Sequence, residues 1–294
     1  MKKPALKLLA MAVLGSCGSA HAVICNITAT SVPLTTLYKS GTATQVTGTI
    51  SGSCTRETAD IARPYIYIGI NQGEPPAGRS MTRQNGTQLL SYEIYHRTYG
   101  SGVWTEGTGV TNTSATNGGV LYRMANNATA QAFSFPYYMQ IPTPQATAPA
   151  GIYDDLAVTA TIRLSTAAGS ATGAVLAATS FGVSASIQHS CYFSTSPAPL
   201  VLNYTSFTAS PATASAGFAL SCTYNTPYTL VIGPPSTGTL LGLNYSLALS
   251  AATGTGSAAP QNFSVNGTVA AGQSGICTTS SCTASQAHTI TVGF

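Results

Sequence analysis

Three small groups of residues in this chain have the types and spacing that active-site or metal chemistry needs. Asp154 and Asp155 are adjacent carboxylates, which suit acid and base work or a calcium site. Glu93 and His96 lie three positions apart in a Ser-rich chain, a combination that hydrolases use. Cys277, Cys282 and His288 are of the residue types that bind zinc. Each group needs further partners elsewhere in the sequence.

Those partners are missing. Residues 164–294 contain no Lys, Arg, Asp or Glu, and only His189 and His288 titrate near neutral pH there. A fourth zinc ligand, a second carboxylate cluster and a nucleophile elbow are all lacking. We therefore predict that the protein is not an enzyme and has no cofactor and no metal. Asp154 and Asp155 are expected in a turn before a strand.

The first residues have the pattern of a secretory signal peptide. A positively charged start, an apolar stretch over 8–15 and a small-residue cleavage site at Ala20-His21-Ala22 predict cleavage after residue 22. The apolar stretch is too short to span a bilayer. A less favoured alternative is lipid attachment at Cys17, after Leu14-Gly15-Ser16.

Loss of the signal peptide changes the charge and cysteine counts. Eight basic residues then face seven acidic ones, a net charge of +1, so no basic patch attracts nucleic acid or anionic lipid. Six cysteines remain in a chain sent to an oxidising compartment, which predicts disulfides. Their spacing suggests that Cys25 pairs with Cys54, Cys191 with Cys222, and Cys277 with Cys282. The zinc site is the alternative for the last pair.

The elements that position these residues are all expected to be strands. Short alternating or β-branched runs bounded by Gly, Pro, Asn or Ser recur along the chain, and no convincing amphipathic helix occurs. This pattern predicts an all-β fold of antiparallel sandwiches, and the mature length of about 270 residues suits two of them. The expected strands cover 44–51, 65–70, 88–95, 133–141, 156–164, 175–187, 199–204, 217–223, 228–232, 243–249, 263–269 and 288–294.

Short motifs in both halves occur in a characteristic order. In the first half they are Cys25, Cys54-Thr55-Arg56, Gly78-Arg79-Ser80-Met81, Leu90-Ser91-Tyr92-Glu93-Ile94-Tyr95, Val103-Trp104 and Ala150-Gly151-Ile152-Tyr153-Asp154-Asp155. In the second half they are Cys191, Ser221-Cys222-Thr223, Leu243-Asn244-Tyr245-Ser246-Leu247, Ala271-Gly272-Gln273 and residues 288–294. In this order and spacing the chain resembles the spore coat U domain, the pilin-type module of archaic chaperone–usher pili in Gram-negative bacteria.

The match to this family is not uniform. The first half has Thr105-Glu106-Gly107 where the family often has Gly-Asp-Gly, and the second half lacks the Trp and the Arg-x-Met motif. Trp104, Tyr92 and Tyr95 occupy positions that are aromatic in the family generally, so we expect them in the core, with an aromatic ligand platform as the alternative.

The resemblance implies immunoglobulin-like sandwiches that lack their last strand. A periplasmic chaperone lends that strand first, and the N-terminal extension of the adjacent pilin subunit replaces it after assembly at an outer-membrane usher. The second half fits, because it stops after one last apolar strand. Ile290, Val292 and Phe294 share one face of that strand at period two and are expected to border the open groove.

The first half is expected to complete itself. Residues 175–187 alternate through Phe181, Val183, Ala185 and Ile187 toward Cys191, and in ordinary pilins such a segment is the one donated to a neighbour. We therefore predict an N-terminal adhesin domain at 23–188 and an incomplete pilin domain at 189–294. Only Val23 and Ile24 precede Cys25, too few residues to donate, which predicts a subunit at the fibre tip.

The function expected from this arrangement is a pilus tip adhesin that mediates attachment to surfaces and biofilm formation. It would be secreted through the periplasm to the cell surface and would bind an abiotic or host surface. The alternative is a secreted, spore-coat-like or carbohydrate-binding sandwich protein. Strand direction places three connections, 56–64, 97–130 and 165–173, at the end away from the second domain. Their candidate contact residues are Ala59, Ile61, Ala62, Val110, Ala115, Val120, Ala167, Ala168 and Ala171.

Overall fold

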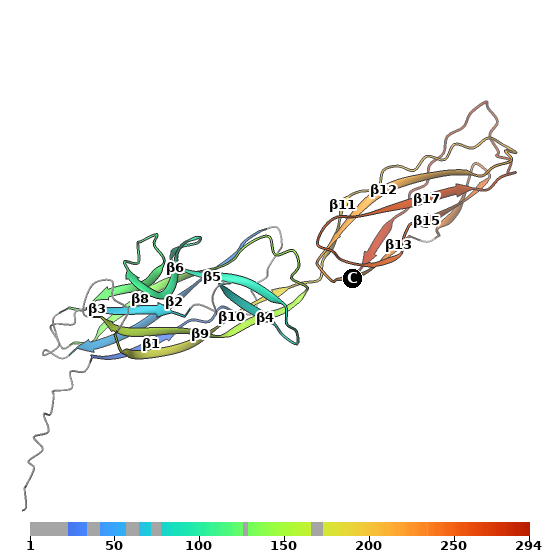
Figure 1. Ribbon diagram of the computed structural model, residues 1–294. Coiled ribbons are helices and arrows are strands. Elements are labelled where there is room, and N and C mark those ends of the chain that lie inside the picture. Colours follow the sequence, from blue (N-terminus) through green and yellow to red (C-terminus); the bar gives the residue numbers. More distant parts are fainter. Residues whose placement is uncertain are drawn as a thin grey trace, which may run out of the picture.

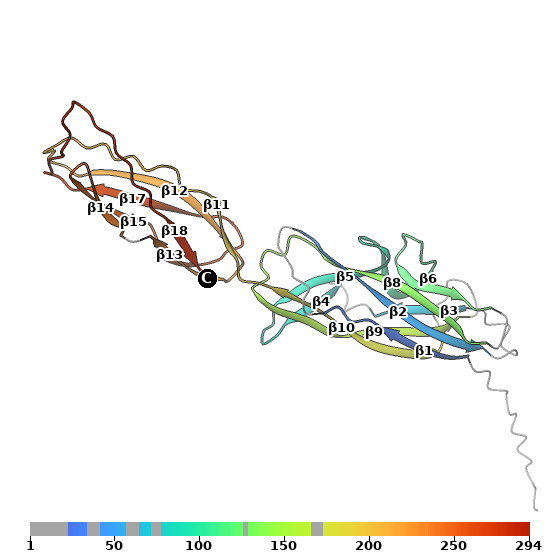
Figure 2. The same ribbon diagram turned by 180° about the vertical axis from the view of Figure 1, so that it is seen from behind.

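The computed structural model describes residues 23–33, 42–56, 65–71, 78–125, 129–165, 173–233 and 235–294. The described chain is built from strands that form two lobes, as Figure 1 shows and Figure 2 shows from behind. No helical segment suited in length and apolarity to crossing a bilayer occurs in these described ranges. Every regular element of the described chain is a strand, so the all-β fold is confirmed for the described ranges.

Lobe 1 consists of strands β1 to β10. Their bounds are β1 Val23–Ala29, β2 Thr44–Arg56, β3 Tyr65–Ile70, β4 Arg79–Arg83, β5 Leu89–Thr98, β6 Ser101–Val110, β7 Gly118–Arg123, β8 Gln131–Ile141, β9 Gly151–Ser165 and β10 Val175–Ile187. One layer has the order β1-β2-β8-β5, and the other contains β10, β9, β3 and β7. Strands β4 and β6 join the layers, because β4 pairs with both β5 and β9, and β6 with both β5 and β7.

The two layers of lobe 1 enclose one apolar core. Ile50 and Met139 enter it from one layer, and Ile68, Val158 and Ile162 enter it from the other, all of them buried. Their burial follows from the period-two alternation of the strands, which turns every second side chain inward. Tyr92 and Trp104 are also buried, so the prediction that they pack in the core is confirmed. The same prediction for Tyr95 is wrong, because its side chain alternates to the other face of β5 and is only partly buried.

The Gly-Arg-Ser-Met motif has a structural role in lobe 1. Met81 is fully buried, and so, almost entirely, is Arg79. The guanidinium group of Arg79 donates to the backbone oxygens of Asn71 (2.7 Å) and Trp104 (2.6 Å) and forms an ion pair with Glu93. A buried charge needs such partners. The motif therefore ties the start of β4 to β5 and β6.

Lobe 2 consists of strands β11 to β18. Their bounds are β11 Cys191–Thr195, β12 Ala212–Cys222, β13 Pro227–Ile232, β14 Thr237–Leu240, β15 Leu243–Leu249, β16 Thr253–Thr255, β17 Gln261–Val269 and β18 Ile290–Gly293. A five-stranded sheet has the order β11-β12-β17-β15-β14, and a three-stranded sheet has the order β16-β13-β18. The second core lies between them, with Phe218, Leu220 and Val265 from one sheet and Leu230 and Ile232 from the other.

Most of the expected strands are present, with boundaries moved by a few residues. The expectation for 199–204 is wrong, because these residues form no strand. Leu200 still packs against the core of lobe 2. The alternating pattern therefore places the side chains, but Pro197 and Pro199 cannot donate to a ladder, which keeps the adjoining backbone out of the sheet. The segment 97–130, expected as a connection, contains β6 and β7.

Candidate functional site

Strand β10 lies on the edge of β9 in lobe 1. It pairs antiparallel with β9 from Val175 opposite Arg163 to Ile187 opposite Gly151. Its other side meets the chain after β1, where Val32 bridges to Val183 in parallel and its amide donates to the oxygen of Gly182 at 2.9 Å. Both edges of β10 thus have backbone partners in the same lobe.

The four alternating side chains of β10 are buried. Phe181 is 3% exposed, Val183 and Ala185 are 0% exposed, and Ile187 is 7% exposed. They belong to the same core cluster as the inner residues of β9 and β8. Burial of a Val, Ile or Phe side chain contributes about 1.5–3 kcal/mol, so β10 contributes a substantial part of the stability of the lobe 1 core.

The two lobes share a set of strand pairings. In each lobe, the first strand pairs with the second, and one disulfide joins these two strands. The strands that follow them across the sheet also correspond between the lobes. The matching pairs are β1–β2 with β11–β12, β2–β8 with β12–β17, β8–β5 with β17–β15, and β3–β9 with β13–β18. By this correspondence β18 takes the place of β9. The partner of β9 is β10, but no described strand takes that place beside β18.

The consequence is visible in the burial of the two corresponding strands. In β9 the inward residues Val158 and Ile162 are 1% and 0% exposed. In β18 the inward residues Ile290 and Val292 pack against the core of lobe 2 but remain only partly buried. Phe294 follows the strand and is 59% exposed, and its place at the border of the groove stays a prediction. The outer edge of β18 is the candidate functional site, an open sheet edge beside an incompletely covered core.

Disulfides hold the first two strands of each lobe together. Cys25 is the register partner of Cys54, and Cys191 is the register partner of Cys222, with Cα atoms 4.1 Å apart in both pairs. Cys277 and Cys282 form the third disulfide in the segment between β17 and β18. The three predicted pairings are confirmed. Because Cys277 and Cys282 bond to each other, their thiolates are not available to a zinc ion.

The end of lobe 1 that lies away from lobe 2, here called its outer end, is defined by strand register. Val23 lies opposite Arg56, and Tyr65 lies opposite both Arg123 and Ser165. These residues flank the connections 57–64, 126–128 and 166–172. At the other end Ile187 lies opposite Gly151, next to lobe 2 (Figure 1). The residues that flank these connections therefore lie at the predicted end.

Three of the nine candidate contact residues lie in the described chain. Val120 is fully buried in β7, so its prediction as a surface contact is wrong; its segment is a strand rather than a surface connection, and its side chain belongs to the core of lobe 1. Val110 is partly buried at the end of β6, and Ala115 is exposed in the connection between β6 and β7. The other six, Ala59, Ile61, Ala62, Ala167, Ala168 and Ala171, lie outside the described residues.

The residues that first suggested chemistry take part in packing. His96 is buried, its ring nitrogens lie 3.4 and 3.2 Å from the backbone oxygens of Asn112 and Thr116, and Glu93 pairs with Arg79 instead. Asp155 accepts a hydrogen bond of 2.8 Å from the hydroxyl of Tyr92. Burial, reinforced by the charge of Asp155, raises the pKa of Tyr92 well above its ordinary value. Within the described ranges no cluster of three potential metal ligands occurs.

Asp154 and Asp155 lie within β9 rather than in the turn expected before it. That expectation is therefore wrong in detail. Asp154 accepts a hydrogen bond from the side-chain amide of Gln84 at 2.6 Å, and Asp155 also accepts one from the backbone amide of Ala157 at 3.0 Å. The register of β9 against β10 shifts between Phe181 and Val183, opposite these residues, so the pair sits at an irregularity of the ladder.

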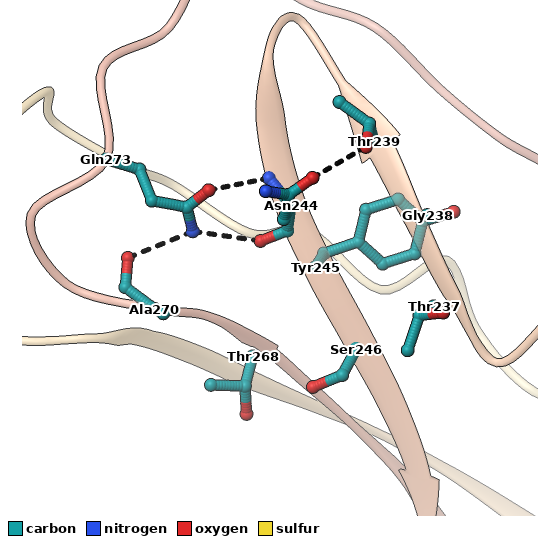
Figure 3. A pocket seen from close by; sticks show the side chains of 9 residues that line it. All are labelled: Thr237, Gly238, Thr239, Asn244, Tyr245, Ser246, Thr268, Ala270 and Gln273. Atoms are coloured by element: carbon teal, nitrogen blue, oxygen red, sulfur yellow. Dashed lines mark hydrogen bonds between the residues drawn. The ribbon is translucent and has the colours of Figure 1, made fainter.

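Lobe 2 also has a shallow polar depression of about 570 Å³ between β14, β15 and the end of β17. Figure 3 shows the side chain of Gln273 against the backbone of Asn244, whose amide and oxygen it bonds at 2.7 and 3.0 Å. Thr239 donates to the side-chain oxygen of Asn244 at 2.7 Å. These polar groups bond to each other, so they fix the loops of this end of the lobe.

Two features of the structure were not predicted from the sequence. The residues after β1, Ser31 and Val32, contact β10, but they gave no signal because they lie beyond the alternating run. Phe207 and Ile276 are exposed large apolar residues outside any predicted strand. Apolar side chains in a Ser- and Gly-rich loop are the signal that would have marked them.

Comparisons with known proteins identify part of the chain. The family model of the Spore Coat Protein U domain matches residues 11–161, a span that ends within β9 and before β10. A search of curated proteins found no match.

Two solved structures show weak likenesses. One is the CsuC–CsuE chaperone–tip adhesion subunit pre-assembly complex from archaic chaperone–usher Csu pili of Acinetobacter baumannii, with 15% identity, a TM-score of 0.40, and coverage of 92% of this chain and 100% of that chain. The other is AggA, the major subunit of aggregative adherence fimbriae type I from Escherichia coli, with 14% identity, a TM-score of 0.27, and coverage of 57% and 95%. Likenesses of this strength do not assign a function.

Proposed function

Because the chain belongs to the spore coat protein U domain family, we propose that it is a chaperone–usher pilus subunit that stands at the fibre tip as an adhesin. The family to which it belongs resembles pilin-type modules in which one strand comes from another chain. The observation that carries the proposal is the contrast between β9, which has β10 on its edge, and β18, whose corresponding edge is open among the described strands.

The open edge of β18 is the proposed strand-accepting site. An added strand would pair its backbone with β18 and place alternate apolar side chains over Ile290 and Val292, as Phe181 and Val183 do over the core of lobe 1. We propose that a periplasmic chaperone supplies this strand first and that an adjacent pilin subunit supplies it in the fibre, with transfer at an outer-membrane usher.

The tip position follows from how the strands of lobe 1 are used. Strand β10, the element that an ordinary pilin would donate, is paired with β9, and β1 is paired with β2. Both are committed to their own lobe, so neither is free for a neighbour. We accordingly propose a self-completed adhesin domain at 23–188 and an accepting pilin domain at 189–294. The family match ending at residue 161 agrees with β10 being additional to the module.

Attachment is assigned to the outer end of lobe 1. The proposed contact residues are small or apolar. Ala59, Ile61, Ala62, Ala167, Ala168 and Ala171 belong to connections that flank this end, and Val110 and Ala115 belong to the end of β6 and to the connection that follows it. Exposed apolar tips favour contact with hydrophobic surfaces over selective binding of one receptor. The proposed role is attachment of piliated cells at the start of a biofilm.

The test replaces Ile61, Val110 and Ala168 by Ser in the full chain within an assembled pilus. Attachment of piliated cells to hydrophobic plastic should fall at least several-fold while electron microscopy shows normal fibre numbers. The control is Val231→Ser, which removes an exposed apolar residue of lobe 2. Unchanged attachment by the triple variant would contradict the adhesive role of these connections. A second test deletes the chaperone, which should cause loss of the full chain from the periplasm.

A further inference from the structure

The end of lobe 2 that lies away from lobe 1 is defined by strand register, and we call it the outer end of lobe 2. Val269 at the end of β17 lies opposite both Ala212 and Tyr245, and the turn from β14 to β15 lies beyond Tyr245. The connections 196–211, 241–242 and 270–289 therefore gather at this end (Figure 1). At the other end Cys191 lies opposite Cys222, next to lobe 1.

Three apolar residues meet at this outer end, and we call them the outer apolar patch: Phe207, Leu241 and Ile276. Phe207 is 74% exposed and Ile276 is 73% exposed, and Leu241 is partly buried. The amide of Phe207 donates to the oxygen of Gln273 at 2.8 Å, and the amide of Ile276 donates to the oxygen of Leu241 at 2.9 Å. These bonds hold the three residues on neighbouring loops.

The patch is built at some conformational cost. Phe207 has φ of 60° and Leu241 has φ of 52°, a left-handed conformation that bulky residues rarely adopt. Further bonds join the same loops: the hydroxyl of Tyr204 donates to the oxygen of Gln273 at 3.2 Å, and the amide of Gly275 donates to Ser206 at 3.4 Å. A lobe without any charged residue thus holds two large apolar side chains outward at one end.

The direction of β18 indicates what covers this patch. In lobe 1, β9 begins next to lobe 2, and β10 runs antiparallel to it, so β10 leaves the lobe at that end. Only Gln188, His189 and Ser190 then separate Ile187 from Cys191, the first residue of the next lobe. In lobe 2, Ile290 lies opposite Ile232 and Gly293 lies opposite Thr229, so β18 runs toward lobe 1. A strand added antiparallel to it would run toward the outer end of lobe 2, where the patch lies.

We infer that the outer apolar patch is a docking surface for the body of the pilin subunit whose strand completes lobe 2. This inference rests on the proposed function. Four extended residues span about 14 Å at most. A pilin body joined to the added strand as closely as lobe 2 is joined to lobe 1 would therefore begin toward the outer end of lobe 2, where the patch is exposed. Since residues 164–294 carry no charged side chain, the contact is apolar on this side and little affected by salt.

The test compares a strand with a whole subunit. The full chain, purified with its chaperone, is mixed either with a synthetic peptide of the neighbouring pilin's N-terminal strand or with that whole pilin. Hydrogen exchange is followed at the amides of β18 and at those of the outer apolar patch. Both additions should release the chaperone while the amides of β18 stay protected, and only the whole subunit should slow exchange at the patch, by tenfold or more.

The variant Phe207→Ser/Ile276→Ser should accept the peptide at the unaltered rate but lose the patch protection given by the whole subunit. The control Val231→Ser removes a 55% exposed apolar residue of β13 and should behave as the unaltered chain does. Protection of β18 by the whole subunit without protection of the patch would overturn the docking surface and leave the proposed function standing. Failure of both the peptide and the subunit to replace the chaperone on β18 would overturn both the docking surface and the proposed function. If sedimentation shows that the chaperone complex associates with itself and this association protects the patch, the patch is a contact with a second copy of this chain. That result would overturn the inference.

Discussion

The ring of Phe181 in β10 lies 5.4 Å from the ring of Tyr137 in β8, with the two planes inclined by 38°. The contact crosses from one layer of lobe 1 to the other, so Phe181 fills the interior of the sandwich. Tyr137 reaches this position because its cross-strand partner is Gly48, where a Cβ atom would collide with the ring. Through this pair, completion of the sheet edge and completion of the core depend on the same strand.

The first prediction concerns removal of β10. Residues 23–188 expressed in the periplasm should give a soluble monomer, whereas the same segment ended at Leu164 should aggregate, because the edge of β9 and the core beneath β10 become exposed. Size-exclusion chromatography measures both. A soluble monomer from the shorter segment would contradict internal completion.

The same dependence should appear in a point variant. Phe181→Asp should prevent folding or lower the free energy of unfolding by several kcal/mol, because it places an unpaired charge in the core. The matched control is Leu156→Asp on the neighbouring strand, where the side chain is 69% exposed and the change should be small. Equal losses of stability in the two variants would show that the side chain at position 181 does not contribute more to the core than the exposed side chain at position 156.

The second prediction is that lobe 2 accepts a strand in the same chain. Appending a copy of residues 166–187 after Phe294 should allow the full chain to accumulate in the periplasm as a monomer without a chaperone. The added alternating segment has the length and direction to pair with β18, as β10 pairs with β9. Placing Asp at the copied positions of Phe181 and Val183 is the control and should restore dependence on the chaperone. Identical yields from both chains would exclude a strand-accepting edge.

The third prediction concerns the two disulfides that join the first strands. In the chain-entropy description, a bridge that closes about 30 residues stabilises a domain by about 3 to 4 kcal/mol. Cys191→Ala/Cys222→Ala should be the more damaging change, because the core of lobe 2 is the smaller and is incompletely covered. Urea unfolding of the strand-completed protein, compared with Cys25→Ala/Cys54→Ala, measures the difference.

The fourth prediction is a loss of lobe 1 stability at alkaline pH. Burial raises the pKa of both Tyr67 and Tyr92 above the ordinary value of 10.0, so in the folded state these phenols stay protonated where the unfolded chain ionises. Their contribution is complete below pH 10 and is lost as the pH rises above it, by about 1.4 kcal/mol per pH unit for each phenol.

Trp104 provides the measurement for this prediction, because it is the only tryptophan and is fully buried in lobe 1. Its fluorescence should report unfolding at lower urea concentrations at pH 11 than at pH 9. Tyr92→Phe should reduce the slope of stability against pH, since one of the two titrating groups is gone, although it also removes the bond to Asp155. A slope that does not change on this substitution would contradict the assignment to Tyr92.

The sequence alone determined the local features of this protein. Alternation at period two located most strands, because a half-buried sheet forces inward and outward positions to alternate. The even cysteine count and the two spacings of about 30 residues predicted pairs that turned out to be register partners on neighbouring strands. The alternation of Phe181, Val183, Ala185 and Ile187 identified β10, because its inward face carries an uninterrupted apolar row.

Only the tertiary structure decided how these strands meet. The alternation of 199–204 looked like a strand, but prolines beside it leave the backbone outside the ladder. Val120 looked like a surface residue, because the segment 97–130 was expected to be a connection, whereas it contains β6 and β7. The open edge of β18 and the outer apolar patch depend on contacts between residues far apart in sequence, which local periodicity does not encode. Phe207 and Ile276 belong to one surface because backbone bonds bring their loops together.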